Sequence, residues 1–283
     1  ILDYHVLRSY SNYIYLFGIF LLLLVLVAGA EIRGTRGWFY IWEFGIQPVE
    51  FIKLFLIIFL ARFFSSIAMK TRPLKYLIIS GGLVGIYVLL VMRQPDFGSS
   101  LLLIFVWLVI VMMAGFKKKY FVVIGMILLV VFTSFWFAFF KDYQKQRIMT
   151  FLNPSFDPLG QGYNISQAII AVGAGNLTGR GIGFGSQSQL KFLPEAQNDF
   201  IFAVISEELG FLGVSLVFLF YIIFFYRALT KTKKISNDFG IFFILGCLGL
   251  IFIEMFINIG MNIGLLPVVG ISLPFVSYGG SAL

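Results

Sequence analysis

The sequence predicts an all-α membrane protein whose helices cross the bilayer several times. Of its 283 residues, 60% are hydrophobic, 12% are charged and 35 are phenylalanine, and the mean hydropathy is +0.97. A water-soluble domain carries about twice that share of charged residues and cannot bury so much apolar surface. Long apolar stretches recur along the chain, so we expect a bundle of membrane-spanning helices.

Seven apolar stretches are long enough to cross the hydrocarbon core, which takes about 20 helical residues. A shorter apolar stretch at 264–276 contains Pro267 and Pro274, which favours a broken or re-entrant element. We therefore expect a single integral membrane domain over residues 1–283, with a long extracytoplasmic loop at about 141–199. The predicted spans are 13–30, 48–67, 74–92, 98–116, 120–140, 200–226 and 239–263.

Basic residues cluster in three connections between the predicted spans. Under strict alternation these connections fall on one side, and the excess of Lys and Arg makes that side cytoplasmic. The net charge of +8 therefore indicates topology rather than a nucleic-acid partner. The basic connections contain Arg62, Lys70, Arg72 and Lys75, then Lys117, Lys118 and Lys119, and then Arg227, Lys231, Lys233 and Lys234.

The scarcity of metal-binding and nucleophilic side chains excludes several chemistries. His5 is the one histidine and Cys247 the one cysteine of the chain. A histidine-based catalytic triad, a His-ligated metal site, an internal disulfide and a thiolate cluster are all ruled out. The glycine run between 173 and 185 lacks the preceding strand and the spacing of a dinucleotide-binding fingerprint, so we reject that motif as well.

Polar residues inside or beside a span are costly in hydrocarbon and are functional candidates by default. Glu50 and Lys53 lie three residues apart on one helical face, where they can neutralise each other. They could form a structural ion pair, an anion-binding or proton-handling cavity near the outer surface, or both.

A second polar group follows Arg93, where Pro95 breaks the chain. Asp96 is placed to cap the next helix by accepting from the amides of Gly98 and Ser99. Capping alone would explain Asp96, and a direct role in a site is an equally open interpretation.

Asp199 lies where the long polar loop enters the sixth predicted span. A partly desolvated carboxylate at the mouth of a cavity could act as a general base, although an aspartate at a helix start is also an ordinary cap. Glu207 and Glu208 follow about 12–14 Å further along the helix. Two carboxylates at that depth need partners or protonation, and the sequence does not show which.

Seven polar and turn-forming stretches, in order along the whole chain, together form a specific pattern. They are Gln47-Pro48-Val49-Glu50 with Lys53, Gln94-Pro95-Asp96-Phe97-Gly98, Asp157-Pro158-Leu159-Gly160, Gly185-Ser186-Gln187-Ser188-Gln189-Leu190, Phe192-Leu193-Pro194-Glu195 with Asp199, Glu207-Glu208-Leu209-Gly210, and 264–281. This pattern resembles the SEDS family (shape, elongation, division and sporulation), most closely its elongation branch, RodA. Members have ten membrane helices, so we expect this chain to be a fragment lacking two helices before it and one after it.

The resemblance implies a peptidoglycan glycosyltransferase that polymerises lipid II on the outer face of the bacterial cytoplasmic membrane, for cell elongation and rod shape. The essential aspartate of the family maps onto Asp199, which we expect to be the catalytic base. Cationic side chains would bind the departing pyrophosphate. The expected substrate-binding residues are Glu50, Lys53, Arg93 and Asp96, with Arg147, Arg180 and Lys191 as weaker candidates. In this set Glu50 would orient Lys53.

The expected partners are lipid II, the lipid-linked glycan strand, membrane lipids and a class B penicillin-binding protein, which is a transpeptidase. The sequence requires no cofactor, although a divalent cation (Mg or Mn) bound to the pyrophosphate is compatible with it.

Two alternative functions stay open. A lipid II flippase would use the polar pairs Glu50–Lys53 and Glu207–Glu208 and would need essential polar residues on both sides of the membrane, whereas a non-catalytic scaffold for a transpeptidase would not need Asp199.

Overall fold

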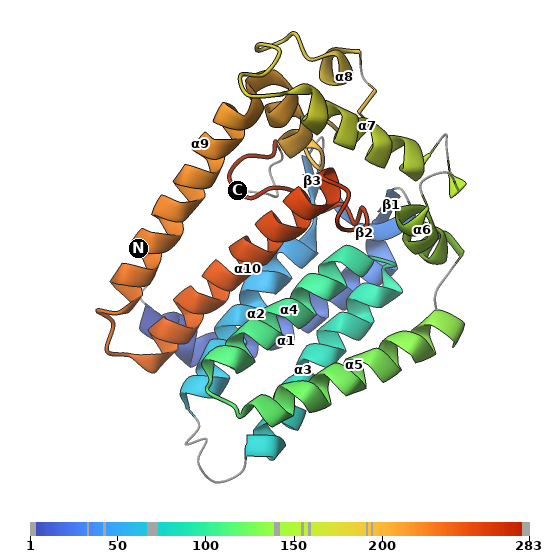
Figure 1. Cartoon of the computed structure of the whole chain (residues 1–283). Helices are drawn as coiled ribbons and strands as arrows, with labels where there is room; N and C mark the ends of the chain where they lie inside the picture. The colour runs from blue at the N-terminus through green and yellow to red at the C-terminus, as the bar shows by residue number, and fades with distance from the viewer. Residues whose placement is uncertain are drawn as a thin grey trace. The chain divides into compact units, whose positions relative to one another are not determined.

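The computed structural model describes residues 4–32, 34–41, 44–66, 73–138, 142–153, 156–157, 160–190, 192–193 and 195–278. Within these ranges the chain forms helices and one small sheet (Figure 1). The elements are α1 (Tyr4–Ala28), β1 (Ala30–Ile32), β2 (Thr35–Ile41), β3 (Phe44–Ile46), α2 (Pro48–Ser65), α3 (Pro73–Arg93), α4 (Phe97–Met113), α5 (Lys118–Ala138), α6 (Asp142–Leu152), α7 (Gln161–Ala174), α8 (Ser186–Gln189), α9 (Ile201–Thr232) and α10 (Asp238–Asn262).

Each of the seven predicted spans is a helix, which confirms the predicted fold class. By length and composition, α1, α3, α9 and α10 can cross a membrane. The apolar helix α4 has 17 residues, and α2 carries charged side chains at Glu50, Lys53 and Arg62. The stretch 264–276 contains no helix, in agreement with the broken element predicted there.

The strands β1, β2 and β3 form an antiparallel sheet in that order, whereas no strand was predicted in the connection at 31–47. The aromatic and β-branched residues of β2 favour a strand, and Glu31 of β1 pairs with Arg36 of β2. The Arg36 amide also donates to the Gln94 carbonyl at 3.2 Å. That bond fixes the sheet beside the turn between α3 and α4.

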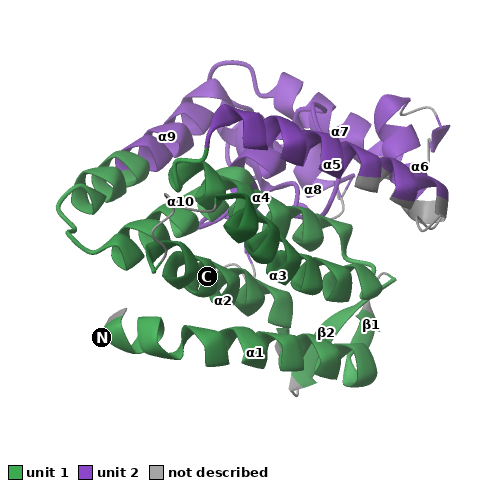
Figure 2. Ribbon diagram, turned by 90° about the horizontal axis from the view of Figure 1, so that it is seen from below, with its two compact units in different colours: residues 1–116, 224–253, 283 green, residues 117–223, 254–282 purple. Residues whose placement is uncertain are grey.

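The chain divides into two compact units, coloured separately in Figure 2. Unit 1 comprises residues 1–116, 224–253 and 283, and unit 2 comprises residues 117–223 and 254–282. The helices α9 and α10 each contribute one part to each unit.

Paired aromatic side chains join the helices of unit 1. The rings of Tyr15 in α1 and Tyr87 in α3 stack with their centroids 4.8 Å apart. The Tyr87 hydroxyl donates to the Tyr15 carbonyl and the Tyr15 hydroxyl to the Leu83 carbonyl, each at 2.8 Å. Trp107 of α4 donates to the Ser80 hydroxyl of α3 at 3.0 Å. Buried polar groups are thereby satisfied inside the protein, as the membrane requires.

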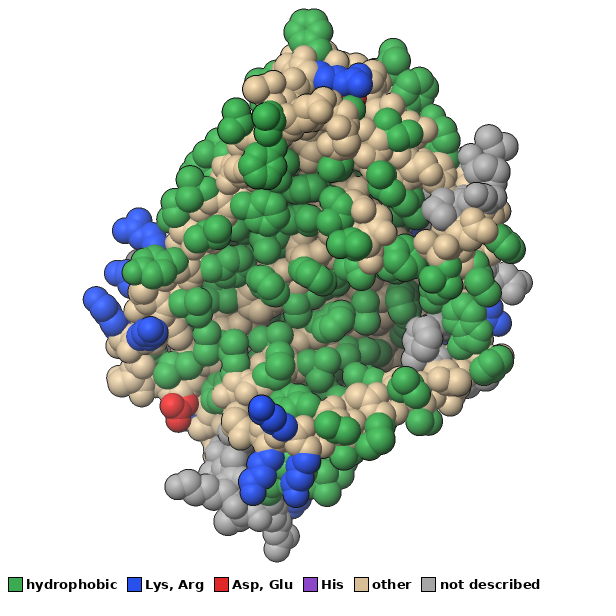
Figure 3. Space-filling view, viewed as in Figure 1, with side chains coloured by type: hydrophobic (Ala, Val, Ile, Leu, Met, Phe, Trp, Pro, Cys, Tyr) green, Lys and Arg blue, Asp and Glu red, His purple; other side chains and the backbone are tan. Residues whose placement is uncertain are grey.

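The ends of α2 and α4 and the start of α10 lie at one end of unit 1. The ring of Phe64 in α2 lies 6.1 Å from that of Phe116 and 6.3 Å from that of Phe242 in α10. This is the common end that the alternation of spans predicts. Figure 3 shows Lys and Arg side chains gathered beside the connection from α9 to α10, on a face that is otherwise mostly apolar. An apolar surface of such extent is typical of contact with lipid.

In unit 2, α7 packs on the first turns of α9. Ala168 and Ala171 of α7 form a buried cluster with Leu193, Phe200 and Ala203. Small residues let the two backbones approach closely, as in other membrane helix pairs. Figure 1 shows α7 and α8 beside the beginning of α9.

Candidate active site

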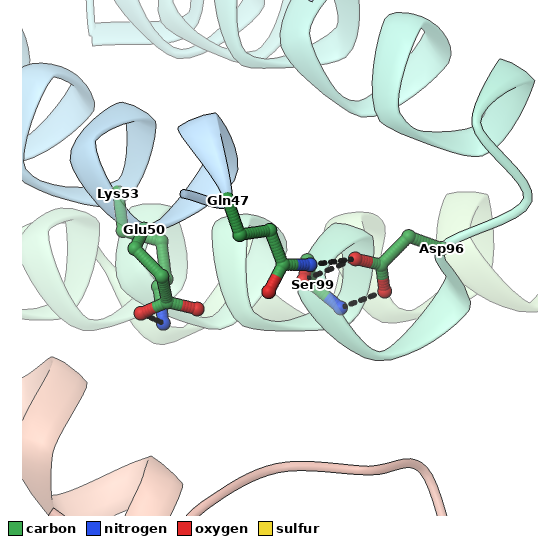
Figure 4. A network of polar contacts seen from close by, with 5 residues as sticks. All are labelled: Gln47, Glu50, Lys53, Asp96 and Ser99. Atoms are coloured by element: carbon green, nitrogen blue, oxygen red, sulfur yellow. Dashed lines mark hydrogen bonds and ion pairs between the residues drawn. The ribbon is translucent and has the colours of Figure 1, made fainter. Parts of the chain in front are cut away.

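Asp96 caps α4, as predicted, and is held by three bonds. Its Oδ1 accepts from the Ser99 amide at 2.9 Å, and its Oδ2 accepts from the Ser99 hydroxyl at 2.7 Å and from Nε2 of Gln47 at 3.3 Å. The Ser99 hydroxyl thus supplies the second bond that was expected from the Gly98 amide. Because Gln47 directly precedes α2, this network ties the start of α2 to the start of α4 (Figure 4).

Glu50 and Lys53 form the predicted ion pair, with Oε2 and Nζ 2.6 Å apart. The Lys53 side chain is 5% exposed and that of Glu50 is 30% exposed. A buried ammonium needs a nearby counter-charge, and Glu50 supplies one. Figure 4 shows this pair beside the Gln47–Asp96 pair at the beginning of α2.

The turn between α3 and α4 adds a cation and an amide to this group. Arg93 is exposed at the end of α3, whereas Gln94 is buried. A Cβ atom built on Gly37 of β2 would lie 3.6 Å from Oε1 of Gln94 and 3.9 Å from Nε2 of Gln47. The small sheet therefore passes directly over the side chains that surround the network.

Asp199 lies in unit 2, half-buried, in a turn directly before α9. In a regular helix each carbonyl accepts from the amide four residues later. Here the carbonyls of Gln197, Asn198 and Asp199 bind other partners. The Gln197 carbonyl accepts from the Tyr278 amide at 2.9 Å, and the Asn198 carbonyl from the Ser277 hydroxyl at 2.8 Å. The C-terminal stretch of unit 2 thus holds this turn outside the helix.

The Asp199 carbonyl is held by α10. It accepts from Nδ2 of Asn258 at 3.0 Å and from Nδ2 of Asn262 at 2.9 Å, and both asparagines are fully buried. The carboxylate lies beside the Gly270 turn, where a Cβ atom would come 3.6 Å from Oδ2. Gly270 has φ +73°, a conformation that glycine adopts without strain.

Neither asparagine was predicted as a site residue, although the sequence carries a signal for both. Asn258 and Asn262 are four residues apart, so they lie on one face of an otherwise apolar predicted span. A buried amide also costs free energy unless it is hydrogen-bonded, so a pair of asparagines on one face of a span is a functional candidate as well.

The helix α9 is interrupted at Gly210, which has φ +64° and ψ −161°, whereas a continuous span was predicted. A segment of the preceding loop supplies the hydrogen bonds that the break removes. The amides of Arg180 and Gly181 donate to the carbonyls of Glu207 and Glu208 at 2.9 and 3.0 Å.

On the other side of the break the direction of donation is reversed. The Phe211 amide donates to the Asn176 carbonyl at 2.9 Å, and the Leu212 amide donates to the Leu177 carbonyl at 3.1 Å. Backbone groups at membrane depth must be satisfied by protein, and this insertion meets that requirement on both sides of Gly210.

The structure shows the partners of the buried Glu207 carboxylate and the half-buried Glu208 carboxylate. Glu207 accepts the amides of Gln187 and Ser188 at 2.9 and 3.2 Å and the Ser186 hydroxyl at 3.3 Å. Glu208 accepts the Ser188 hydroxyl at 3.1 Å. These bonds anchor α8 and the loop of residues 175–190, here called the 175–190 loop, on the first half of α9.

The remaining candidate cations are placed as follows. The Arg180 guanidinium donates to the Ser186 hydroxyl at 2.6 Å, so this residue belongs to the 175–190 loop. Arg147 lies half-buried on α6, and Lys191 lies outside the described residues. Glu50, Lys53, Arg93 and Asp96 form the polar group of unit 1, while Arg147, Arg180 and Asp199 belong to unit 2.

Comparison with known proteins identifies the family. Residues 1–283 match the family model of the FtsW, RodA and SpoVE cell cycle proteins. The chain belongs to this family. This FtsW/RodA/SpoVE chain is 39% identical over 278 residues to the peptidoglycan glycosyltransferase MrdB of Escherichia coli strain K12, an alignment that covers 98% of the chain and 75% of MrdB.

Solved structures agree with the assignment to the FtsW/RodA/SpoVE family. A chain of a peptidoglycan synthase complex, described for its structural coordination of polymerization and crosslinking, matches with a TM-score of 0.84 and 29% identity, covering all of this chain and 79% of that one. The rod shape determining protein RodA of Thermus thermophilus matches with a TM-score of 0.70 and 26% identity, covering all of this chain and 75% of RodA. The resemblance to the SEDS family is therefore confirmed.

Proposed function

We propose that this chain is a peptidoglycan glycosyltransferase that polymerises lipid II, with Asp199 as the catalytic base. The observation that carries the proposal is the 39% identity to a named peptidoglycan glycosyltransferase over nearly the whole chain. The geometry supports it. The Asp199 carboxylate is half-buried, and the Asp199 backbone carbonyl accepts two hydrogen bonds that hold the residue in its turn. Such anchoring is what a general base needs, since its reach to the reacting proton must be fixed.

In the proposed reaction the C4 hydroxyl of an acceptor GlcNAc attacks the anomeric carbon of a lipid-linked MurNAc. The new glycosidic bond forms as the bond from that carbon to the polyprenyl pyrophosphate breaks, with inversion at the carbon. The leaving pyrophosphate takes the electron pair, and the Asp199 carboxylate takes the proton of the attacking hydroxyl. Positive side chains stabilise the charge that develops on the pyrophosphate.

The cations expected from the sequence to bind that pyrophosphate, Lys53 and Arg93, belong to unit 1. The ion pair with Glu50 holds the Lys53 ammonium in a fixed position. Arg93 is exposed and can present its guanidinium to phosphate oxygens in a bidentate manner. The Asp96 carboxylate already accepts three internal bonds, which favours a role in orienting this turn over direct contact with the substrate.

We further propose that the site works on the outer face of the bacterial cytoplasmic membrane, together with a class B penicillin-binding protein. The positive-inside rule supports this orientation, because the basic connections leave from one end of unit 1. The fold shared with a chain of a peptidoglycan synthase complex supports a crosslinking partner. The likeness to a rod shape determining protein supports a role in elongation.

The flippase alternative is disfavoured by the contacts of Glu207 and Glu208. These carboxylates are bonded to the backbone and side chains of α8, so they serve the fold of the 175–190 loop. A flippase would need them as part of a polar path for the headgroup.

The test is polymerisation of lipid II by the purified full-length protein, wild type against Asp199→Asn. We expect glycan strands from the wild type and none from Asp199→Asn, which keeps the shape of the side chain but cannot take the proton. Asp238→Asn is a matched control, because Asp238 is exposed at the start of α10, and it should polymerise normally. Strands from both wild type and Asp199→Asn, or from neither, would contradict the proposal. Headgroup translocation in liposomes that survives Asp199→Asn would favour the flippase.

A further inference from the structure

The side chain of Asn262 occupies the place of a helical hydrogen bond. If α9 began one residue earlier, the Ala203 amide would donate directly to the Asp199 carbonyl, four residues before it. Instead the Ala203 amide donates to Oδ1 of Asn262 at 3.2 Å, and Nδ2 of Asn262 donates to the Asp199 carbonyl at 2.9 Å. A side chain inserted into the hydrogen-bond ladder opens a helix at that point, so Asn262 keeps Asp199 out of α9.

Asn258 reinforces the same arrangement from one turn away on α10. Its Nδ2 donates to the Asp199 carbonyl at 3.0 Å and to the Ile271 carbonyl at 2.7 Å. Nδ2 of Asn262 also donates to the Asn258 carbonyl at 2.8 Å. Each Nδ2 carries two hydrogens, and each of the two nitrogens donates to two carbonyls. Both residues are completely buried, so neither touches a substrate that reaches the surface of the site.

We propose that Asn262, assisted by Asn258, is a positioning residue that sets the direction of the Asp199 carboxylate. The inference rests on the proposed function of Asp199 as the base. Without the Asn262 amide, the Ala203 amide and the Asp199 carbonyl can bond to each other. The helix α9 would then begin one residue earlier, which would make Asp199 its N-cap and turn the Asp199 side chain away from its present direction.

The expected effect is on the chemical step. A displacement of about 1 Å at a reacting group can cost about 100-fold in rate. We therefore expect Asn262→Ala to lower kcat by about 10- to 100-fold while KM for lipid II changes by less than about threefold, because the lost group does not contact the substrate. Asn262→Gln retains an amide donor and acceptor and should restore part of kcat.

Two measurements test the proposal on the full-length protein, with rates normalised to folded protein by size-exclusion chromatography. The first is kcat and KM of lipid II polymerisation. The second does not depend on activity: Asp199→Cys is introduced together with Cys247→Ala, and the rate of thiol reaction with a charged methanethiosulfonate reagent is measured with and without Asn262→Ala. We expect that rate to change several-fold when Asn262 is replaced.

Ser206→Ala is the matched control, because the buried Ser206 hydroxyl bonds only to the Phe202 carbonyl of its own helix in the described contacts. It should leave kcat and the thiol rate unchanged. If Asn262→Ala does not fold, Asn258→Ala and Asn262→Gln test the same carbonyl. An unchanged kcat with an unchanged thiol rate, or a raised KM at normal kcat, would overturn the inference. Polymerisation by Asp199→Asn would instead refute the proposed base, while the thiol rate would still decide whether Asn262 positions residue 199.

Discussion

The buried carboxylate of Glu207 accepts the backbone amide of Gln187 at 2.9 Å, so a side chain inside α9 holds a loop residue that lies 20 positions earlier in the chain. The Ser188 amide binds the other oxygen of the same carboxylate at 3.2 Å. A charged group at this depth is therefore explained by the backbone donors that it satisfies, and it need not take part in chemistry.

Replacing Glu207 should release the 175–190 loop. Glu207→Ala leaves two amides without their acceptor, and each unsatisfied buried donor costs about 1–3 kcal/mol. We expect a lower midpoint of thermal unfolding and faster tryptic cleavage after Arg180. Glu31→Ala, at an exposed glutamate in β1, is the control and should change neither. Cleavage of Glu207→Ala at the wild-type rate would show that the carboxylate does not hold the loop.

Gly210→Ala should destabilise the protein because Gly210 has φ +64°. With ψ −161° this conformation is essentially restricted to glycine and costs other residues about 1–3 kcal/mol, and the alanine Cβ would overlap the Gly179 amide nitrogen. Gly85 in α3 has open space around a built Cβ, so Gly85→Ala should be neutral or stabilising by up to about 1 kcal/mol. Unfolding midpoints in detergent provide the comparison, and equal midpoints for the two variants would argue against a strained break in α9.

The Glu50–Lys53 pair should respond asymmetrically to mutation. Lys53 is much more buried than Glu50, so Glu50→Ala leaves the more deeply buried charge behind and should cost about 3 kcal/mol of unfolding free energy. Lys53→Met leaves the more exposed carboxylate and should cost less. The double variant should be more stable than Glu50→Ala alone, which a double-mutant cycle of unfolding free energies measures. Additive losses would mean that the two side chains do not interact.

Arg93→Ala should weaken binding of the pyrophosphate of lipid II. A hydrogen bond to a charged group contributes about 1.5–3 kcal/mol, so KM for lipid II should rise about tenfold or more. Arg62→Ala is the matched control, because Arg62 donates to the Ser9 carbonyl and the Ser11 hydroxyl at the other end of α2. A KM for Arg93→Ala that equals the value for Arg62→Ala would remove Arg93 from the phosphate site.

Local patterns in the sequence predicted the parts of the site that depend on neighbouring residues. The Glu50–Lys53 pair and the Asp96 cap each join groups three residues apart, a separation that helix geometry fixes. The asparagine contacts to Asp199 join residues 59 and 63 positions apart, and no periodicity encodes such a pairing. The break at Gly210 was missed for the same reason, since an apolar stretch reads as continuous unless the inserted segment is known.

The insertion at the break in α9 is made by main-chain atoms, which has a consequence for how this segment can vary. The side chain of Leu177 is 69% exposed, while its carbonyl accepts from the Leu212 amide. Exchange of this side chain leaves the bond intact. Adding or deleting one residue between Leu177 and Arg180 would instead shift the bonds of Asn176 and Leu177 out of register with those of Arg180 and Gly181. The segment is therefore strict in length and permissive at Leu177, whereas Gly179 has φ +77° and a Cβ atom there would overlap the Glu208 carbonyl, so that position requires glycine.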